Sequence, residues 1–169
     1  MHWASEEPSI GAALFLDTTV YIDVLQDRSP KEVDDLLWGR ACHHSAVCLA
    51  ELTHLFGRLD PAHPETSKVL RAVRQTIEDI PEYRLHAPEI AIWAQAGMLA
   101  GEVARLTGLS KREGNGRRFF NDALICLQAQ RLGANVLTSN IRDYDFLNPL
   151  LPRVRTIFYR RQSPRGGAD

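Results

Sequence analysis

The sequence contains no long apolar run and no large excess of charge of either sign. No stretch approaches the roughly 18 consecutive apolar residues that a membrane-spanning helix needs. The first residues carry Glu6 and Glu7 without a lysine or arginine, unlike a signal peptide. A formal net charge of −1 excludes a protein that is basic over its whole surface. These absences predict a cytoplasmic protein that does not enter a membrane.

Cysteine is also scarce. The three cysteines, Cys42, Cys48 and Cys126, are odd in number, and no pair has the CxxC spacing of many metal and redox sites. We expect reduced thiols that fill the core, because a reducing cytoplasm does not favour disulfides. A zinc site that combines cysteines with the pair His43-His44 is disfavoured, since adjacent residues of a strand point to opposite faces.

The length of the chain sets its domain organisation. With 169 residues, 44% hydrophobic and 24% charged, it is long enough for one domain with a real core and too short for two ordinary domains. We expect this domain to cover residues 13–159. Residues 1–12 and 160–169 are expected to be a flexible N-terminal extension and a flexible C-terminal tail.

Short apolar runs alternate with longer segments of helical periodicity. Strands are expected at 14–16, 43–47, 134–138 and 155–158, with an extended piece near 83–85. Helices are expected from about residue 20, over 30–40, from 51 to 56, and over 65–79, 89–107 and 121–132, with a polar loop at 110–118. This alternation predicts an α/β fold of three layers, in which helices flank a central parallel sheet of four or five short strands.

Acidic residues recur near the ends of the expected strands. Asp17 ends the first strand, Glu51 lies in the first turn of the helix after the second strand, and Asp122 opens the helix before the third strand. Because ligands bind beyond the carboxyl ends of parallel strands, these carboxylates are expected at one edge of the sheet. Each acid alone could instead cap a helix or offset its dipole. Glu51 fits that explanation least, because its neighbours in AVCLAELTHL are mostly apolar.

Several carboxylates close together raise one another's pKa values unless a cation neutralises them. Oxygen ligands of this kind suit Mg²⁺ or Mn²⁺, which also bind substrate phosphate. A divalent ion held there can activate water and offset the charge that develops on a phosphodiester under attack. The pattern therefore favours metal-dependent hydrolysis of a phosphodiester.

Three segments in order resemble the successive motifs of PIN-domain nucleases, and above all of the VapC-like toxins of bacterial toxin–antitoxin pairs: LFLDTTVYIDVL (14–25), AVCLAELTHL (46–55) and FFNDALICLQAQRLGANVLTSNIRDYDFL (119–147). The resemblance implies a PIN-like fold and an endoribonuclease, a hydrolase that cleaves RNA with Mg²⁺ or Mn²⁺. It also implies a homodimer and a cognate antitoxin, of which one segment lies in the acidic groove and blocks the metal site.

The resemblance also implies roles for individual acids. Asp17 and Asp122 match the two direct metal ligands, and Glu51 matches the acidic position that often reaches the metal through water. Relatives often have an aspartate at a fourth position, where this chain has Asn140. An asparagine can still coordinate through oxygen, or Asp143 can supply the charge instead.

Other residues near these acids are candidates for contact with the substrate. The resemblance implies that Thr138 and Ser139 position substrate or a water. A basic cluster before Asp122 could grip RNA phosphates, and it consists of Lys111, Arg112, Arg117 and Arg118. The alternative for this cluster is an ordinary solvated loop. Arginines of the tail, among them Arg155 and Arg161, could add to the same surface or be inert.

Two other functions were weighed against a nuclease. A non-catalytic PIN-like module that binds RNA or serves in assembly is favoured by Asn140, which lowers the charge of the site. A phosphatase or phosphoacceptor domain is disfavoured, because it needs a lysine after a strand end. None of the three lysines is in such a position, namely Lys31, Lys68 and Lys111.

Overall fold

The computed structural model describes residues 1–107 and 115–164. Within these residues six strands form one sheet, in the order β1-β6-β5-β2-β3-β4, and every neighbouring pair is parallel. The strands are β1 His2–Trp3, β2 Leu14–Leu16, β3 Cys42–Ser45, β4 Leu85–His86, β5 Asn135–Thr138 and β6 Thr156–Phe158. The expected α/β fold with a central parallel sheet is confirmed.

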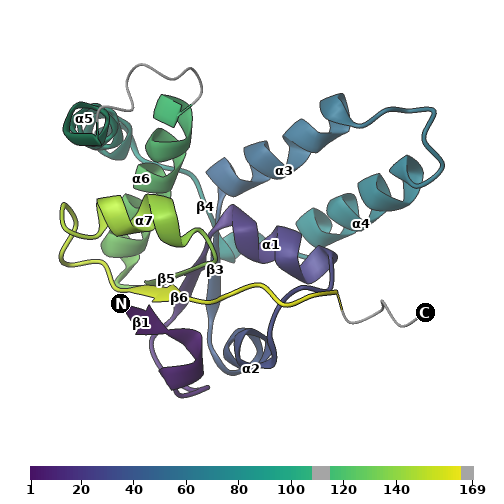
Figure 1. The fold of residues 1–169 in the computed structure, drawn as a ribbon, viewed down its shortest axis with the longest axis horizontal. Coiled ribbons are helices and arrows are strands. Elements are labelled where there is room, and N and C mark those ends of the chain that lie inside the picture. The colour runs from purple at the N-terminus through teal and green to yellow at the C-terminus, as the bar shows by residue number, and fades with distance from the viewer. Residues whose placement is uncertain (108–114, 165–169) are drawn as a thin grey trace.

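Helices cover both faces of this sheet. They are α1 Thr18–Leu25, α2 Lys31–Gly39, α3 Ala46–Arg58, α4 Thr66–Glu78, α5 Ile90–Thr107, α6 Asn115–Leu132 and α7 Ile141–Leu147, with 3-10 turns η1 Ala4–Glu6 and η2 Glu82–Arg84. Figure 1 shows α1, α3 and α4 on one side of the sheet and α5, α6 and α7 on the other. The three layers therefore follow the sequence expectation.

β2 is apolar along its whole length, and β5 and β6 carry buried apolar residues, because helices cover both faces of the sheet. Leu14, Phe15, Leu137, Ile157 and Phe158 are all 0% exposed. The parallel register pairs Leu16 of β2 with Leu137 of β5. The two strands therefore end side by side, and the residues that follow them meet at one edge of the sheet.

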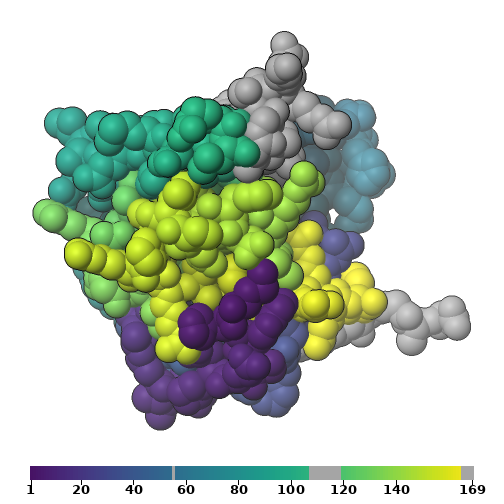
Figure 2. Space-filling view, turned by 60° about the vertical axis from the view of Figure 1, so that its left-hand side comes forward, coloured from purple at the N-terminus to yellow at the C-terminus, as the bar shows by residue number. Residues whose placement is uncertain are grey.

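The first residues of the segment 1–12, which was expected to be a flexible extension, form a strand. His2 and Trp3 pair with Ile157 and Phe158 and so add a sixth strand where four or five were expected. Figure 2 shows the N-terminal residues packed against residues from the end of the chain. A strand of two residues is too short to produce an alternating pattern, which is why the sequence did not reveal it.

Ion pairs also hold the N-terminal segment to the domain. The carboxylate of Glu7, with its side chain only 5% exposed, lies 3.0 Å from the Arg40 guanidinium and also accepts a hydrogen bond from Arg155. A Cβ placed on Gly39 would lie 2.2 Å from the Ser9 carbonyl oxygen. The segment therefore sits tightly against the end of α2.

Two helices differ from their expected bounds. α6 begins at Asn115, so residues 115–118 are helical although a loop was expected over 110–118, and residues 108–114 lie outside the described residues. Asp122 is therefore seven residues past the first residue of α6 and does not open the helix. α7 was not expected from the sequence. Gly133, with a φ of 64°, follows α6 as expected of a helix stop.

Within the part of the chain that the structure describes, no helix combines the length and the apolar character needed to cross a membrane.

Candidate metal centre

Asp17 lies at the edge of the sheet where β2 and β5 end. Its side chain caps the N-terminus of α1 by accepting a hydrogen bond from the Thr19 backbone N–H at 3.4 Å, and the residue is only 2% exposed. One carboxylate oxygen, Oδ2, accepts hydrogen bonds from the hydroxyls of Thr19 at 2.6 Å and Thr138 at 2.8 Å. The other oxygen, Oδ1, accepts one from the Tyr144 hydroxyl at 3.1 Å. Asp17 is thus both a helix cap and a buried acceptor that faces three hydroxyls.

Burial raises the pKa of the Asp17 carboxyl above its ordinary value. The hydrogen bonds from Thr19 and Thr138 lower this pKa, whereas the nearby charge of Glu51 raises it. Among the described residues, neither Asp17 nor Glu51 forms an ion pair with a basic side chain. A buried carboxylate beside a second acid therefore has hydroxyl partners in place of a cation.

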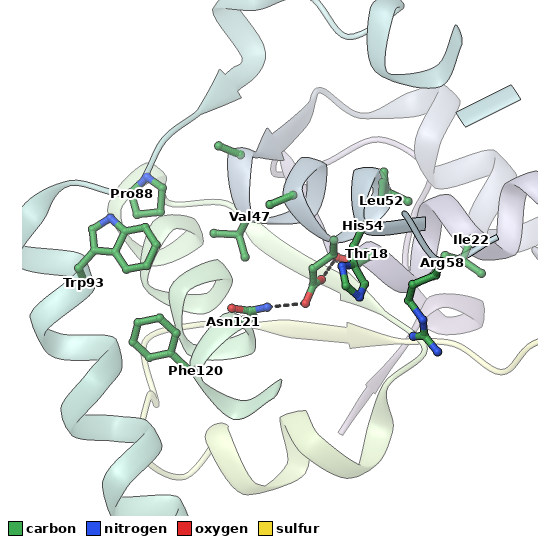
Figure 3. Close-up of a pocket in the computed structure, with 13 residues that line it drawn as sticks. Thr18, Ile22, Val47, Leu52, His54, Arg58, Pro88, Trp93, Phe120 and Asn121 are labelled. Atoms are coloured by element: carbon green, nitrogen blue, oxygen red, sulfur yellow. Dashed lines mark hydrogen bonds between the residues drawn. The ribbon is translucent and has the colours of Figure 1, made fainter. Parts of the chain in front are cut away.

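Glu51 connects three helices at this edge. It lies in α3, past the first turn in which it was expected. Its Oε1 accepts a hydrogen bond from Nδ2 of Asn121 in α6 at 2.6 Å, and its Oε2 accepts one from the hydroxyl of Thr18 in α1. Figure 3 shows both interactions as dashed lines.

Asp122 is 8% exposed and lies one residue after Asn121. Its Oδ2 accepts a hydrogen bond from Nδ2 of Asn140 at 3.3 Å, and the same amide donates to Asp143 Oδ2 at 3.1 Å. Asn140 also caps α7, because its side-chain oxygen accepts from the Asp143 backbone N–H. The fourth expected position therefore contains an amide that lies between two carboxylates.

The three central acids all affect the pKa of one buried thiol, that of Cys48. The pKa of the Cys48 thiol is raised well above its usual range by burial, and the charges of Asp17, Glu51 and Asp122 raise it further. Asp17 and Asp122 likewise raise the pKa of the Tyr144 hydroxyl, after the larger effect of burial. The structure therefore brings together acids from three separate segments of the sequence.

The chemistry of these donors fits a hard divalent cation, because the acids offer oxygen atoms and Asp17 carries a raised pKa without a cationic partner. However, among the described residues no group of three or more His, Cys, Asp or Glu side chains is arranged to hold a metal ion. Thr18 and Asn121 occupy both oxygens of Glu51. The carboxylates of this site are thus held in place by hydrogen bonds from hydroxyls and amides.

The residues expected to position substrate also bind within this network. Thr138 donates to Asp17, as described above, and accepts from the Asn140 backbone N–H at 2.9 Å. The Ser139 backbone N–H donates to the Thr19 hydroxyl at 3.1 Å. Of the expected phosphate contacts, Lys111 and Arg112 lie outside the described residues, and so do the side chains of Arg117 and Arg118.

Asp23 is a buried acid to which the sequence analysis assigned no role. It is 0% exposed, and its Oδ2 accepts hydrogen bonds at 2.8 Å from the hydroxyls of Ser139 and Tyr159. Arg161 donates to the same oxygen at 3.1 Å and places its Nε 2.8 Å from Oδ1. The signal available in the sequence was its position three residues after Val20, on the buried face of α1.

The described part of the tail that was expected to be flexible over 160–169 makes contacts with the domain. Arg161 binds Asp23, and the backbone N–H of Gln162 donates to the Arg28 carbonyl at 2.9 Å. Residues 165–169 lie outside the described residues. The last strand is therefore followed by a segment that is bound to α1 and to the turn after it.

The two adjacent histidines point to different partners, as expected for a strand. His43 Nδ1 lies 3.0 Å from Nε2 of His86, whereas His44 Nδ1 lies 2.6 Å from the Tyr21 hydroxyl. Burial, aided by the charge of His43, lowers the pKa of His44 to about 4. His44 is therefore neutral near pH 7.

A hollow of about 920 Å³ opens beside Glu51. Its walls come from α1, α3, α5 and α6 and from Pro88, which precedes α5 (Figure 3). The residues at its two ends differ in chemistry, with Trp93 and Phe120 at one end and His54 and Arg58 at the other. The candidate metal centre thus has an open space next to it that is large enough for part of a ligand.

Several solved structures share this fold. The VapBC2 structure from Rickettsia felis, bound to a DNA fragment from their promoter, contains a chain that matches with a TM-score of 0.56 and 15% identity, covering 87% of this chain and 98% of that one. The FitAcB structure from Neisseria gonorrhoeae matches with a TM-score of 0.57 and 19% identity, covering 86% and 96%. The VapBC-5 structure from Mycobacterium tuberculosis matches with a TM-score of 0.54 and 21% identity, covering 88% and 100%.

These matches confirm the expected PIN-like fold and the expected likeness to proteins of VapBC toxin–antitoxin systems, at the level of the fold. Identities of 15 to 21% leave the chemistry to the residues of this chain. No family model matches the sequence, and no curated protein matches it.

Proposed function

We propose that this protein is a metal-dependent endoribonuclease and the toxin of a type II toxin–antitoxin pair, acting in the cytoplasm. The observation that supports this most is the buried Asp17 carboxylate, which shares one edge of the parallel sheet with Glu51 and Asp122 and has no cationic partner among the described residues. In this proposal Asp17 and Asp122 hold Mg²⁺ or Mn²⁺, and Glu51 acts on the ion through water. When bound, the ion supplies an activated water and offsets the charge of the scissile phosphate.

The protein's own groups position these acids. The hydroxyls of Thr19, Thr138 and Tyr144 fix both oxygens of Asp17. Because the amide of Asn140 donates to Asp122 and Asp143, we assign it a positioning role and assign the fourth negative charge to Asp143. Ser139, whose hydroxyl donates to Asp23, positions Thr19 through its backbone in this proposal.

The proposed partners follow from the solved structures that share the fold, which are VapBC and FitAcB assemblies. We propose a cognate antitoxin, one segment of which enters the acidic groove with a basic side chain. We also propose a homodimer, because α2 and α5 expose large apolar side chains such as Trp38 at 91% and Ile90 at 90%. Light scattering of the purified protein measures this oligomeric state.

The test of the proposed activity is cleavage of RNA with and without Mg²⁺ or Mn²⁺. We expect metal-dependent cleavage by the wild type and a loss of about 100-fold or more in Asp17→Asn and Asp122→Asn, since each variant removes a charged oxygen ligand. Asp145→Asn is the matched control, because Asp145 is an exposed acid of α7. Cleavage without metal, or full activity in both variants, would refute the proposal.

A second candidate is a PIN-like module that binds RNA or an assembly partner without catalysis. Two observations favour it: Asn140 replaces an acid, and no group of three metal-binding side chains is present among the described residues. Calorimetric titration with Mn²⁺ separates the candidates. Retained RNA binding, with neither Mn²⁺ binding nor cleavage, would establish the module.

A further inference from the structure

The hollow beside Glu51 has an aromatic end that no other feature of the site uses. Trp93 of α5 and Phe120 of α6 line it, with ring centroids 5.6 Å apart and ring planes inclined by 40°. Trp93 is 46% exposed. A half-exposed indole that borders an open hollow offers the kind of surface on which nucleobases stack.

The opposite end of the hollow is basic. His54 and Arg58 lie in the second half of α3, and both are exposed. Figure 3 shows His54 beside Thr18 and Arg58 on the far side of Thr18 from the aromatic pair. An arginine at this place provides a positive charge for a phosphate oxygen. One end of the hollow is therefore suited to a base and the other to the phosphate backbone of the same strand.

The middle of the hollow reaches the candidate metal centre. Phe120 directly precedes Asn121, whose side chain donates to Glu51 at 2.6 Å. Glu51, Asn121 and Thr18 all line the hollow. A base that stacks at the aromatic end would thus place a phosphate near Glu51, the one of the three proposed acids that lines the hollow.

We propose that this hollow is a nucleobase subsite, in which an unpaired base of the RNA stacks on Trp93 while a neighbouring phosphate meets Arg58. The inference rests on the proposed function and specifies its substrate as RNA with an unpaired base at the cleavage site. A base that is paired and stacked in a duplex cannot enter the hollow, so selection for loops and single strands follows.

Binding is tested without cleavage by following Trp93 fluorescence. In the variant with Trp3→Phe and Trp38→Phe, Trp93 is the only tryptophan of the chain. A mixed-sequence single-stranded RNA hexamer is titrated in EDTA at low salt, where a metal-dependent enzyme does not cut it. We expect saturable quenching by the hexamer and little quenching by a blunt RNA duplex of the same sequence.

Variants identify the contact. In the otherwise wild-type chain, Trp93→Ala should weaken hexamer binding by about ten-fold or more, as expected for loss of one stacked base, whereas Trp93→Phe should retain most of the affinity. Tyr83→Ala is the matched control, because Tyr83 is a 75% exposed aromatic residue outside the hollow, and its binding should be unchanged. Arg58→Ala should reduce the dependence of binding on salt by about one phosphate contact.

Four outcomes would overturn the subsite. The first three are an absence of quenching by the hexamer, equal quenching by the duplex, and an equal loss of hexamer affinity in Trp93→Ala and Tyr83→Ala. The fourth is quenching by an arginine-containing apolar peptide but not by RNA, which would assign the hollow to a protein partner. Trp93 emission that changes with protein concentration alone would instead assign it to a second copy of the chain.

The binding assay separates failure of the subsite from failure of the proposed function. Hexamer binding that depends on Trp93, without cleavage under any metal, supports the subsite and refutes the nuclease. Cleavage that depends on Asp17, with KM and hexamer affinity unchanged in Trp93→Ala, refutes the subsite alone.

Discussion

At the scale of single residues, Asp17 combines burial with hydrogen bonds from three hydroxyls and from the Thr19 backbone N–H. Burial costs a charged carboxylate its hydration, and three hydroxyl donors replace only part of it. When no cation is present the carboxyl can be protonated and neutral, because in that form it still interacts with the same hydroxyls. Its ionised form is therefore the form that a bound cation would stabilise most.

Replacing Asp17 should change stability in a pH-dependent way. Because the folded protein raises the pKa of Asp17, its carboxyl holds a proton to higher pH than in the unfolded chain, and stability is lost as pH rises through the folded pKa. We expect Asp17→Asn without metal to have a higher unfolding midpoint than the wild type near pH 7. The difference should shrink toward about pH 4, where the unfolded carboxyl also binds its proton.

Thermal unfolding in EDTA between about pH 4 and pH 8 measures this effect. Asp145→Asn, which removes an exposed acid, should show no such trend. Mn²⁺ should then raise the midpoint of the wild type and not that of Asp17→Asn, because only the carboxylate binds the ion. A wild type that is more stable than Asp17→Asn at pH 7 in EDTA would contradict the assignment.

Removing the buried carboxylate of Asp23 is also expected to lower the stability of the fold. Removing its carboxylate in Asp23→Ala leaves the hydroxyls of Ser139 and Tyr159 without their acceptor, at a position that is fully buried. We expect a loss of about 3 kcal/mol of unfolding free energy, in the range observed when one partner of a buried pair is removed. Arg161→Ala should cost less, about 1 kcal/mol, because the arginine side chain is 46% exposed and water can replace part of its interaction.

Chemical denaturation of both variants tests this order. Lys31→Ala is a suitable control, since its ion pair with Asp35 is exposed at both side chains and contributes little. If Arg161→Ala destabilised the protein more than Asp23→Ala, the buried carboxylate would not be the centre of this cluster.

At the scale of helices and strands, the sequence predicted the elements that have a strong local pattern and missed those that lack one. The apolar runs of β2, β5 and β6 and the periodic α4 and α5 have strong local patterns, and the structure has them near the expected bounds. β1 has two residues and α7 has seven, so neither produces a clear period. Tertiary contacts form these elements, which local sequence does not encode.

The residues of the candidate site also fall into those that the sequence could predict and those that it could not. From the sequence, Asp17, Glu51 and Asp122 were expected at one edge of a parallel sheet, and their joint role as a site stays a prediction. The donors that hold these acids, such as Asn121 for Glu51 and Tyr144 for Asp17, could not be predicted. They come from distant segments, and only the packing of the helices decides which of them meet.

The contact between the N-terminal segment and α2 gives a prediction at the same scale. Gly39→Ala places a methyl group against the Ser9 backbone, which cannot move as a flexible side chain would. We expect a loss of about 1 to 3 kcal/mol, as for other overpacked sites. Gly57→Ala is the matched control, because a Cβ there meets no atom within 4 Å and should stabilise α3 slightly.

Hydrogen exchange shows which part of the fold Gly39→Ala destabilises. In Gly39→Ala we expect faster exchange in the N-terminal segment and in β6, while β2 and β5 keep their protection. Equal stability of Gly39→Ala and wild type would show that residues 7–9 can shift away from α2 at no cost.

At the scale of the whole molecule, both ends of the described chain bind to the domain. β1 pairs with β6, and Arg161 reaches back to Asp23 on α1. Asp23 in turn binds Ser139, whose backbone contacts the Thr19 hydroxyl that holds Asp17. The segment after β6 is thereby joined to the candidate metal centre through a short series of hydrogen bonds.

The two strands at the borders of the sheet have a further consequence. β1 and β4 each contain two residues, so the outer backbone groups available for pairing with another chain are few. Natural proteins use very short border strands of this kind to prevent strands of different molecules from joining into aggregates. The same feature leaves little room for a partner peptide to extend the sheet as an added strand. A protein that binds this molecule would therefore recognise its grooves and side chains.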